Sequence, residues 1–318
     1  MRVLFAGLAS AGHTYPMVPL ALAARDIGHE VHFAAGEHVH APLRRLGLDP
    51  FRPADSFYEI YAEDLEPDLA RLRPDLVVHG WGVPEAGVAA RRAGIPALWH
   101  GFGRMFPRDI GFERPTGGVH LDICPPSLQE ADFLATAERI ALRPVPFPEP
   151  APPVDGRSLV YLTLGTAFGT PEVLTTAIEG LAALGAPVLV ATGRVRPEEL
   201  GSVPGNVTLQ AWVPQAAVVP HAGLVVHHGG SGTTLGALAA GVPQLVLPQG
   251  ADQFANAEAL LAAGAARRLL PGELSADAVT EQARKASSCR DAARAIAAEI
   301  AAMPAPGEVA RERLFAVK

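Results

Sequence analysis

The sequence predicts an α/β protein built from two doubly wound halves, and three features indicate this architecture. Short apolar runs alternate with longer segments rich in Ala and Leu, as expected of parallel strands covered on both faces by helices. A run of six prolines within residues 143–156 interrupts this alternation, which starts again after it. The length of 318 residues and the hydrophobic content of 49% suffice for two ordinary domains with sizeable cores.

The first half, residues 1–142, begins with a predicted buried strand at Val3–Ala6. The start MRVLFAGLASAG is similar to a signal peptide, but Gly7, Gly12 and His13 break its short apolar run. Further strands are expected at Glu30–Ala34, Leu76–Val78 and Pro96–Trp99, with helices at Met17–Ile27, Val39–Leu46, Tyr61–Leu72 and Glu85–Ala93. Glycine follows three of these helices, where a left-handed cap is favoured, at Gly28, Gly47 and Gly94.

The proline-rich segment RPVPFPEPAPPVDG, residues 143–156, predicts a stiff extended linker, because proline continues neither a helix nor a central strand. The second half, residues 157–302, repeats the alternation. Its strands are expected at Leu159–Leu164, Pro187–Ala191, Val207–Gln210, Leu224–Val226 and Gln244–Leu247, and its helices at 252–263, 275–286 and 288–302. Ligands of such sheets bind at the carboxyl ends of the strands, so a cleft between the two halves is the expected site.

Composition argues against several classes of protein. The net charge of -7, the charged fraction of 19% and the lack of a Lys/Arg cluster disfavour nucleic-acid binding. No run of about 18 apolar residues is present, so no membrane span is predicted. Cys124 and Cys289 form no disulfide framework and no metal pattern, and no Asp-rich cation motif occurs. We therefore expect a cytoplasmic protein with reduced thiols and no bound metal.

The segment HHGGSGTT, residues 227–234, lies between a predicted strand and a predicted helix. Gly229 and Gly230 let backbone N–H groups approach a ligand, and the helix N-terminus adds partial positive charge. Ser231 and two threonines add hydroxyls, and a neighbouring histidine can donate a hydrogen bond to a phosphate oxygen. The segment predicts an anion cradle suited to phosphate; the alternative is a tight turn with capping hydroxyls.

Two further segments follow other predicted strands of the second half. The indole of Trp212, in WVPQ, could stack on a base, or it could be a core residue. In ADQFAN, residues 251–256, the Asp252 carboxylate and the Gln253 amide suit pairs of sugar hydroxyls, although Asp252 could simply open a helix. Because three segments after three strands carry such groups, their convergence favours a ligand site.

In the first half, His13 follows the first strand within GLASAGHTYPMVPLA. A histidine whose pKa lies near neutrality can take the proton of an attacking hydroxyl if it is within hydrogen-bond reach. The alternative is a loop histidine that caps a helix. The segment GLASAG does not fit the G-x-G-x-x-G pattern, which disfavours a nucleotide-binding oxidoreductase.

These segments resemble the donor-binding signature of the family-1, GT-B glycosyltransferases. WVPQ and HHGGSGTTLGALAAGVPQLVLPQGADQFANA, within residues 212–257, carry the resemblance, which is strongest to bacterial enzymes that glycosylate antibiotics and other natural products. The resemblance implies two Rossmann-like domains facing across a cleft. Residues 1–142 would bind a small-molecule aglycone acceptor and residues 157–302 a nucleotide-sugar, while the C-terminal tail, residues 303–318, would pack toward the first domain.

The resemblance also implies roles by position. Trp212 would stack on the pyrimidine of the nucleotide-sugar, and Gln215 would contact its base or ribose. His228 would meet the diphosphate, and Asp252 with Gln253 would hold sugar hydroxyls. Further donors to the diphosphate are implied at Gly229, Gly230, Ser231, Gly232 and Thr233.

Two other positions bear on the donor. Thr166, in TLGT after a predicted strand, would also lie near the phosphate. Many relatives carry an acidic, ribose-binding residue where this chain has Gly236. Its absence suits a deoxyribose, so a dTDP-sugar is favoured over a UDP-sugar. This nucleotide-sugar is a co-substrate, and no resident cofactor is expected.

By the same resemblance the reaction inverts the sugar, with His13 as the general base. A carboxylate usually orients such a histidine. In relatives it follows the strand corresponding to Leu76–Val78, where this chain has Gly80. The remaining candidates for the carboxylate are Asp75, Glu85 and Asp109.

Residues 50–75 and 101–145 are shorter than in relatives, where such segments build the acceptor pocket. A trimmed pocket would suit a bulky or flat acceptor. One alternative is a non-catalytic auxiliary partner of a glycosyltransferase; another is a GT-B transferase with a lipid-linked acceptor. A homodimer or an auxiliary protein is a possible assembly. The stretch FYEIYAEDLEPDL, residues 57–69, predicts pocket lining or an amphipathic helix equally well.

Overall fold

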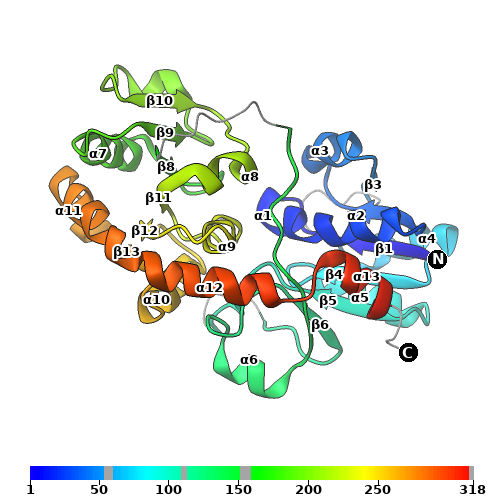
Figure 1. The fold of residues 1–318 in the computed structure, drawn as a ribbon. Coiled ribbons are helices and arrows are strands. Elements are labelled where there is room, and N and C mark those ends of the chain that lie inside the picture. Colours follow the sequence, from blue (N-terminus) through cyan, green and yellow to red (C-terminus); the bar gives the residue numbers. More distant parts are fainter. Residues whose placement is uncertain (54–59, 109–112, 151–158, 315–318) are drawn as a thin grey trace. The chain divides into compact units, whose positions relative to one another are not determined.

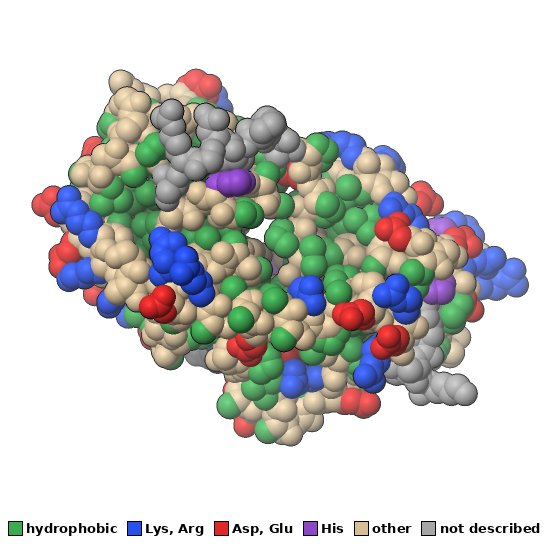
Figure 2. Space-filling view, in the orientation of Figure 1, with side chains coloured by type: hydrophobic (Ala, Val, Ile, Leu, Met, Phe, Trp, Pro, Cys, Tyr) green, Lys and Arg blue, Asp and Glu red, His purple; other side chains and the backbone are tan. Residues whose placement is uncertain are grey.

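The computed structural model describes residues 1–53, 60–108, 113–150 and 159–314 (Figure 1). The chain divides into two compact units, each with its own sheet. The first unit comprises Met1–Phe147 together with Ala302–Lys318, and the second unit comprises Pro148–Ala301. On the face of the molecule in Figure 2, acidic and basic side chains are interspersed, as expected of a mildly acidic protein.

The sheet of the first unit has strands in the order β3-β2-β1-β4-β5-β6-β7, and every neighbouring pair is parallel. Its strands are β1 (Arg2–Ala6), β2 (Glu30–Ala34), β3 (Asp49–Phe51), β4 (Leu76–Gly80), β5 (Ala97–His100), β6 (Val119–Asp122) and β7 (Glu138–Ala141). The four strands predicted for this half are confirmed. The other three were not predicted, because β3 is short and contains Pro50 while β6 and β7 carry charged residues.

The helices of the first unit are α1 (Ala11–Thr14), α2 (Val18–Asp26), α3 (His40–Arg45), α4 (Ala62–Leu72), α5 (Pro84–Arg92), α6 (Ala131–Thr136) and α13 (Pro306–Glu312). The glycines expected to end three helices have φ values of +93° at Gly28, +73° at Gly47 and +68° at Gly94, so the prediction of left-handed caps is confirmed. In the C-terminal tail, α13 packs against α2.

Helix α4 covers part of the first sheet with one apolar face. Leu65, Leu69 and Leu72 are buried against strand residues that include Leu4 and Val77. The described part of the stretch 57–69 therefore contains an amphipathic helix, whereas residues 57–59 lie outside the described residues.

The sheet of the second unit has the order β10-β9-β8-β11-β12-β13, again with parallel neighbours throughout. Its strands are β8 (Leu159–Thr163), β9 (Val188–Ala191), β10 (Val207–Gln210), β11 (Ala222–His227), β12 (Gln244–Val246) and β13 (Ala266–Arg268). Its helices are α7 (Pro171–Ala182), α8 (Gln215–Val218), α9 (Ser231–Ala239), α10 (Gln253–Ala262), α11 (Ala276–Ala286) and α12 (Arg290–Ala302). The predicted strands and helices are found; β13 was missed because its sequence is ARR.

Single-turn 3-10 helices complete the secondary structure: η1 (Tyr15–Met17), η2 (Glu37–Val39), η3 (Pro197–Leu200), η4 (Val219–His221), η5 (Pro271–Glu273) and η6 (Ser287–Cys289).

Helices cover both faces of the second sheet. In Figure 1, α7 and α11 lie on one side of its strands, and α8 and α9 lie on the other. Leu174 and Val279 belong to the core of the first face, and Val218 and Ala237 belong to the core of the second. Coverage on both faces explains why the central strands are continuous apolar runs. Strand β8 lies between β9 and β11, so the strand order reverses beside it, and such switch points are where ligands of these sheets bind.

Candidate functional site

Three loops of the second unit meet at the carboxyl edge of its sheet. Gly165 and Thr166 follow β8, residues 228–230 follow β11, and residues 247–252 follow β12. Because β8, β11 and β12 are neighbouring parallel strands, the loops after them emerge at the same edge. The structure therefore brings together the segments that the sequence singled out after these strands.

The turn after β11 is built so that only glycine fits. Gly229 has a φ of +93°, and a Cβ there would lie 3.0 Å from the carbonyl oxygen of Gln253. A Cβ on Gly230 would lie 2.4 Å from His228 Nε2, and one on Gly165 would lie 2.6 Å from His228 Cε1. The imidazole of His228 is therefore packed against two glycines from two different loops.

Helix α9 begins directly after this turn, with Gly230 as its N-cap. The first backbone N–H groups of a helix have no intrahelical acceptor, and the helix dipole favours an anion beside them. A Cβ on Gly232 would meet nothing within 4 Å, so ligand atoms can reach the backbone of this first turn. The turn can bind a phosphate group through main-chain donors.

Two hydroxyls of this segment are engaged within the protein. Ser231 Oγ donates to Asp252 Oδ2 at 3.3 Å. Thr233 Oγ1 donates to Gln215 Oε1 at 3.1 Å, which connects α9 to α8. These bonds tie the predicted phosphate-, sugar- and base-binding segments to one another, and they leave the backbone N–H groups as the main donors to an anion.

The two histidines of HHGG differ in their surroundings. His227 is fully buried, its Nδ1 accepts a hydrogen bond from the N–H of Gly229 at 3.0 Å, and its Nε2 therefore donates to Gln244 Oε1 at 2.7 Å. Burial lowers the pKa of His227 to about 3, so this ring is neutral. Desolvation lowers the pKa of His228 to about 4, so its imidazole is also neutral when no anion is bound beside it.

Asn256 connects the glycine turn to Asp252, and the sequence did not single it out. Its Nδ2 lies 2.9 Å from the carbonyl oxygen of Gly229 and 3.0 Å from Asp252 Oδ2. Burial raises the pKa of the Asp252 carboxyl. The spacing of four residues between Asp252 and Asn256 on one helix was the available signal for this contact.

Gln253 is only 3% exposed, and its Oε1 accepts hydrogen bonds from the N–H groups of Gln249 at 2.8 Å and Gly250 at 3.2 Å. Its amide oxygen therefore shapes the loop before α10. A role of Gln253 toward a sugar would rest on its Nε2.

Trp212 follows β10 and is 45% exposed, so the alternative of a core tryptophan is wrong. Its Nε1 donates to Glu149 Oε2 at 2.8 Å. Gln215 opens α8 three residues later, and Thr166 is exposed beyond β8. Glu149 is a second residue that the sequence did not single out.

His13 lies in the first unit, in the single-turn helix α1, whose N-cap is Ser10. Its Nδ1 lies 2.8 Å from Ser10 Oγ, its ring centroid lies 4.6 Å from that of Phe102, and a Cβ on Gly82 would lie 3.2 Å from its Cδ2. Burial lowers the pKa of His13 to about 4. A hydroxyl thus stands where a carboxylate partner was expected.

None of the carboxylates that the structure describes hydrogen-bonds His13. Asp75 accepts the N–H of Arg2 at 2.7 Å, and Glu85 lies in the first turn of α5. Asp109 lies outside the described residues.

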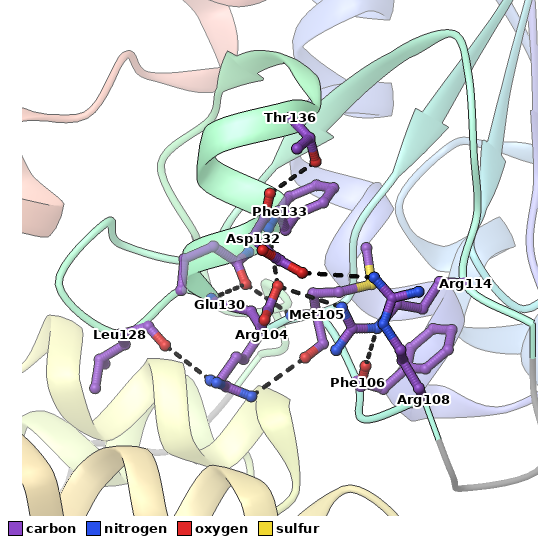
Figure 3. Close-up of polar contacts among 11 residues, drawn as sticks. Arg104, Met105, Phe106, Arg108, Arg114, Leu128, Glu130, Asp132, Phe133 and Thr136 are labelled. Atoms are coloured by element: carbon purple, nitrogen blue, oxygen red, sulfur yellow. Dashed lines mark hydrogen bonds and ion pairs between the residues drawn. The ribbon is translucent and has the colours of Figure 1, made fainter.

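The loop that carries Phe102 is held by a polar network on α6 (Figure 3). Arg114 Nε donates to the carbonyl of Phe106 at 2.8 Å and its Nη1 lies 3.3 Å from Glu130 Oε2, while Arg104 Nε donates to the carbonyl of Leu128 at 3.0 Å. The Glu130 carboxylate also accepts the N–H of Phe133 as the cap of α6. This network fixes one wall beside His13.

A buried hydrophobic cluster joins this loop to the rest of the first unit; it consists of Trp81, Trp99, Met105, Phe106 and Phe133. His79, His100 and His120 are each at most 2% exposed, so they lie in the interior of the first unit. Trp81 Nε1 donates to His120 Nδ1 at 3.2 Å. Trp99 is likewise buried, at 8% exposure.

No group of three or more His, Cys, Asp or Glu side chains among the described residues could hold a metal ion. Within the same ranges, no helix has the length and apolar character needed to cross a membrane.

The chain is similar to known glycosyltransferases of antibiotic pathways. A family model described as erythromycin biosynthesis protein CIII-like, C-terminal domain, matches residues 175–316. Elloramycin glycosyltransferase ElmGT of Streptomyces olivaceus is 33% identical over 383 residues, which cover 98% of this chain and 96% of the relative. That alignment is longer than the 318 residues of this chain, so the relative carries segments that this chain lacks.

Two similar solved structures hold a nucleotide. Glycosyltransferase VinC in complex with dTDP has a TM-score of 0.84 at 25% identity, over 100% of this chain and 99% of that one. Glycosyltransferase SsfS6 of Streptomyces sp. SF2575, complexed with thymidine diphosphate, has a TM-score of 0.78 at 27% identity, over 98% of each chain.

Fold and comparisons together define a glycosyltransferase with the GT-B fold. The chain belongs to the family-1 glycosyltransferases, among the bacterial enzymes of antibiotic and other natural-product pathways.

Proposed function

We propose that this enzyme transfers a sugar, with inversion, from a nucleoside-diphosphate donor to a hydroxyl of a small natural-product aglycone. The second unit binds the donor, and a dTDP-sugar is preferred to a UDP-sugar. The first unit binds the acceptor. The observation that carries the proposal is the turn from His228 to the first residues of α9, where glycine is sterically required and helix N–H groups are free for an anion.

The donor's base stacks on the exposed indole of Trp212, and its diphosphate binds at the N-terminus of α9. The links from Thr233 to Gln215 and from Ser231 to Asp252 support one continuous site for base, phosphate and sugar. The dTDP and thymidine diphosphate held by VinC and SsfS6 support a thymidine nucleotide.

The preference for deoxyribose rests on Gly236. A Cβ at this position would meet nothing within 4 Å, so an acidic side chain would fit without a clash. Steric crowding therefore does not explain why this chain has glycine where many relatives carry an acidic residue. A donor without a 2′-hydroxyl loses nothing by the absence of that acid, whereas a ribose loses a hydrogen bond.

In the reaction, the acceptor oxygen forms a bond to the anomeric carbon from the face opposite the nucleotide. The bond between that carbon and the diphosphate oxygen breaks, and the acceptor proton passes to Nε2 of His13, whose Nδ1 faces Ser10. The helix N-terminus and the neutral His228 stabilise the charge that develops on the departing diphosphate.

Two observations favour a second function, that of a non-catalytic partner of another glycosyltransferase. His13 has a serine hydroxyl rather than a described carboxylate at its Nδ1, and this chain lacks segments that ElmGT carries. Such a partner would bind the nucleotide without turnover.

The test is nucleoside-diphosphate release from dTDP-glucose and UDP-glucose in the presence of a panel of aglycones. We expect acceptor-dependent release that is faster with the dTDP donor and falls at least about 100-fold in His13→Ala. Unchanged release in His13→Ala would remove this residue from its role. Binding of dTDP without turnover of any acceptor would favour the auxiliary function.

A further inference from the structure

The indole of Trp212 is exposed but anchored. Trp81 and Trp99 are 3% and 8% exposed, whereas Trp212 is 45% exposed. Its Nε1 donates to Glu149 Oε2 at 2.8 Å, although the two residues are 63 positions apart in the chain. Both residues belong to the second unit, so this contact lies within one compact body.

The backbone around Glu149 is restricted before the contact forms. Pro148 and Pro150 flank it, and a residue that precedes proline is confined to extended conformations. The carboxylate is thus presented from a stiff segment, and little backbone freedom is lost when it accepts the indole N–H. A surface tryptophan without such a bond would sample several rotamers.

The contact also decides which part of the indole a ligand can use. The N–H edge of the ring is occupied by the carboxylate. The exposed remainder of the ring is the apolar π-face, which is the part that stacks on a base. A ring already held in one orientation loses less freedom when a base stacks on it, and this increases affinity.

We propose that Glu149 is a positioning residue that holds the Trp212 indole in the orientation in which it stacks on the donor's base. This inference rests on the proposed function, because it takes Trp212 as the base-stacking residue. The proline-rich segment then contributes to donor binding in addition to connecting the two halves.

The experiment measures the dissociation constant of dTDP by calorimetry for wild type and single variants. We expect Glu149→Ala to weaken dTDP binding by about 3- to 10-fold, the size expected for the net contribution of one ordinary hydrogen bond. Glu149→Gln keeps an acceptor oxygen and should restore most of the affinity. The KM for the dTDP-sugar should rise in Glu149→Ala by a similar factor, with a much smaller change in kcat.

The matched controls are Glu179→Ala and a double variant. Glu179 is an exposed glutamate of α7 in the same unit, and its replacement should leave dTDP binding unchanged. In a Trp212→Phe background the ring remains but the N–H is absent, so adding Glu149→Ala should have no further effect. A purely structural role of Glu149 would give the same loss in both backgrounds.

The outcomes separate this inference from the proposed function. If Trp212→Ala leaves dTDP binding unchanged, the base site is wrong and the proposed function fails with it. If Trp212→Ala weakens binding while Glu149→Ala does not, only the positioning role of Glu149 is overturned. Urea unfolding of each variant verifies that a loss of binding is not a loss of fold.

Discussion

The N–H of Gly229 donates a hydrogen bond to Nδ1 of His227 at 3.0 Å, and this bond holds the turn that we propose binds the diphosphate. The same imidazole donates to Gln244 on the neighbouring strand β12 at 2.7 Å. The buried, neutral ring thus locks a backbone conformation with a φ of +93° at Gly229. The first histidine of HHGG supports the site without facing the ligand.

Replacing His227 should therefore weaken nucleotide binding through the turn. In His227→Leu both the Gly229 N–H and the Gln244 amide lose their partner in a buried setting. We expect a loss of about 1–3 kcal/mol in the free energy of unfolding, and at least about 10-fold weaker dTDP binding. Urea unfolding and calorimetry measure the two effects. Full retention of dTDP affinity would mean that the turn keeps its shape without the imidazole.

Gly230 tests the steric argument. In Gly230→Ala the new Cβ would lie 2.4 Å from His228 Nε2, so the imidazole must move. We expect kcat/KM for the nucleotide-sugar to fall by at least about 100-fold, because the neutral donor leaves the diphosphate position. Gly272→Ala is the matched control, since nothing lies within 4 Å of a Cβ there. Equal effects of the two variants would contradict the packing of His228 against the turn.

The pH dependence of catalysis should report on His13. Burial lowers its pKa to about 4, and only the neutral ring accepts a proton. The acidic limb of kcat/KM should therefore lie well below pH 6.5, with activity lost as the pH falls toward 4. In Ser10→Asp, a carboxylate would stabilise the imidazolium and shift this limb to higher pH. A wild-type limb near 6.5, or no shift in Ser10→Asp, would contradict the environment described for His13.

Stability should fall on acidification because buried histidines stay neutral in the folded state. Burial lowers the pKa from 6.5 to about 3 in His79 and His227, and to about 4 in His100 and His120. Between pH 6.5 and those values the unfolded chain binds protons that the folded chain does not, so stability decreases as pH decreases. Each contributes up to about 1 kcal/mol per pH unit in that window.

The buried carboxyls Asp122 and Asp252 have raised pKa values and oppose this trend above pH 3.8. His13 and His228, whose pKa values are also lowered to about 4, add to these four histidines. With six histidines against two carboxyls, we expect a lower free energy of unfolding at about pH 5.5 than at about pH 7. Urea titration at both values measures the difference. Equal or greater stability at the lower pH would show that these rings are charged or not buried.

Gly236 tests the preference for deoxyribose. Gly236→Glu places a carboxylate where the family resemblance implies a ribose-binding acid, and the position has room for it. The affinity for UDP should then rise relative to dTDP by at least about 10-fold, the equivalent of one hydrogen bond to a charged acceptor. Gly236→Ala controls for the higher helix propensity of any residue other than glycine. An unchanged ratio of the two dissociation constants would remove Gly236 from nucleotide selection.

Much of the donor site could be predicted because its signals are local. The glycines of HHGG, the helix after them and the exposed Trp212 follow from strand, turn and helix chemistry within short segments. The strands that were missed, β3, β6, β7 and β13, are short or carry charged residues, so periodicity does not reveal them.

The supporting residues could not be predicted, since they depend on contacts over distance or on competition for a hydrogen bond. Glu149 and Trp212 are 63 residues apart in the chain, and no local sequence pattern predicts their hydrogen bond. Ser10 lies only three residues before His13, but the rule that a carboxylate orients a histidine base favoured more distant acids instead. The hydrogen bonds that Gln253 Oε1 accepts from the backbone of Gln249 and Gly250 likewise depend on the shape of the loop before α10, which the sequence does not reveal.

The most direct test of the central claim is a crystal structure of the protein with dTDP. The account predicts the diphosphate at the N-terminus of α9, beside His228 and the N–H groups of Gly230–Gly232, with thymine stacked on Trp212. A well-ordered dTDP bound elsewhere, with that turn unoccupied, would contradict it.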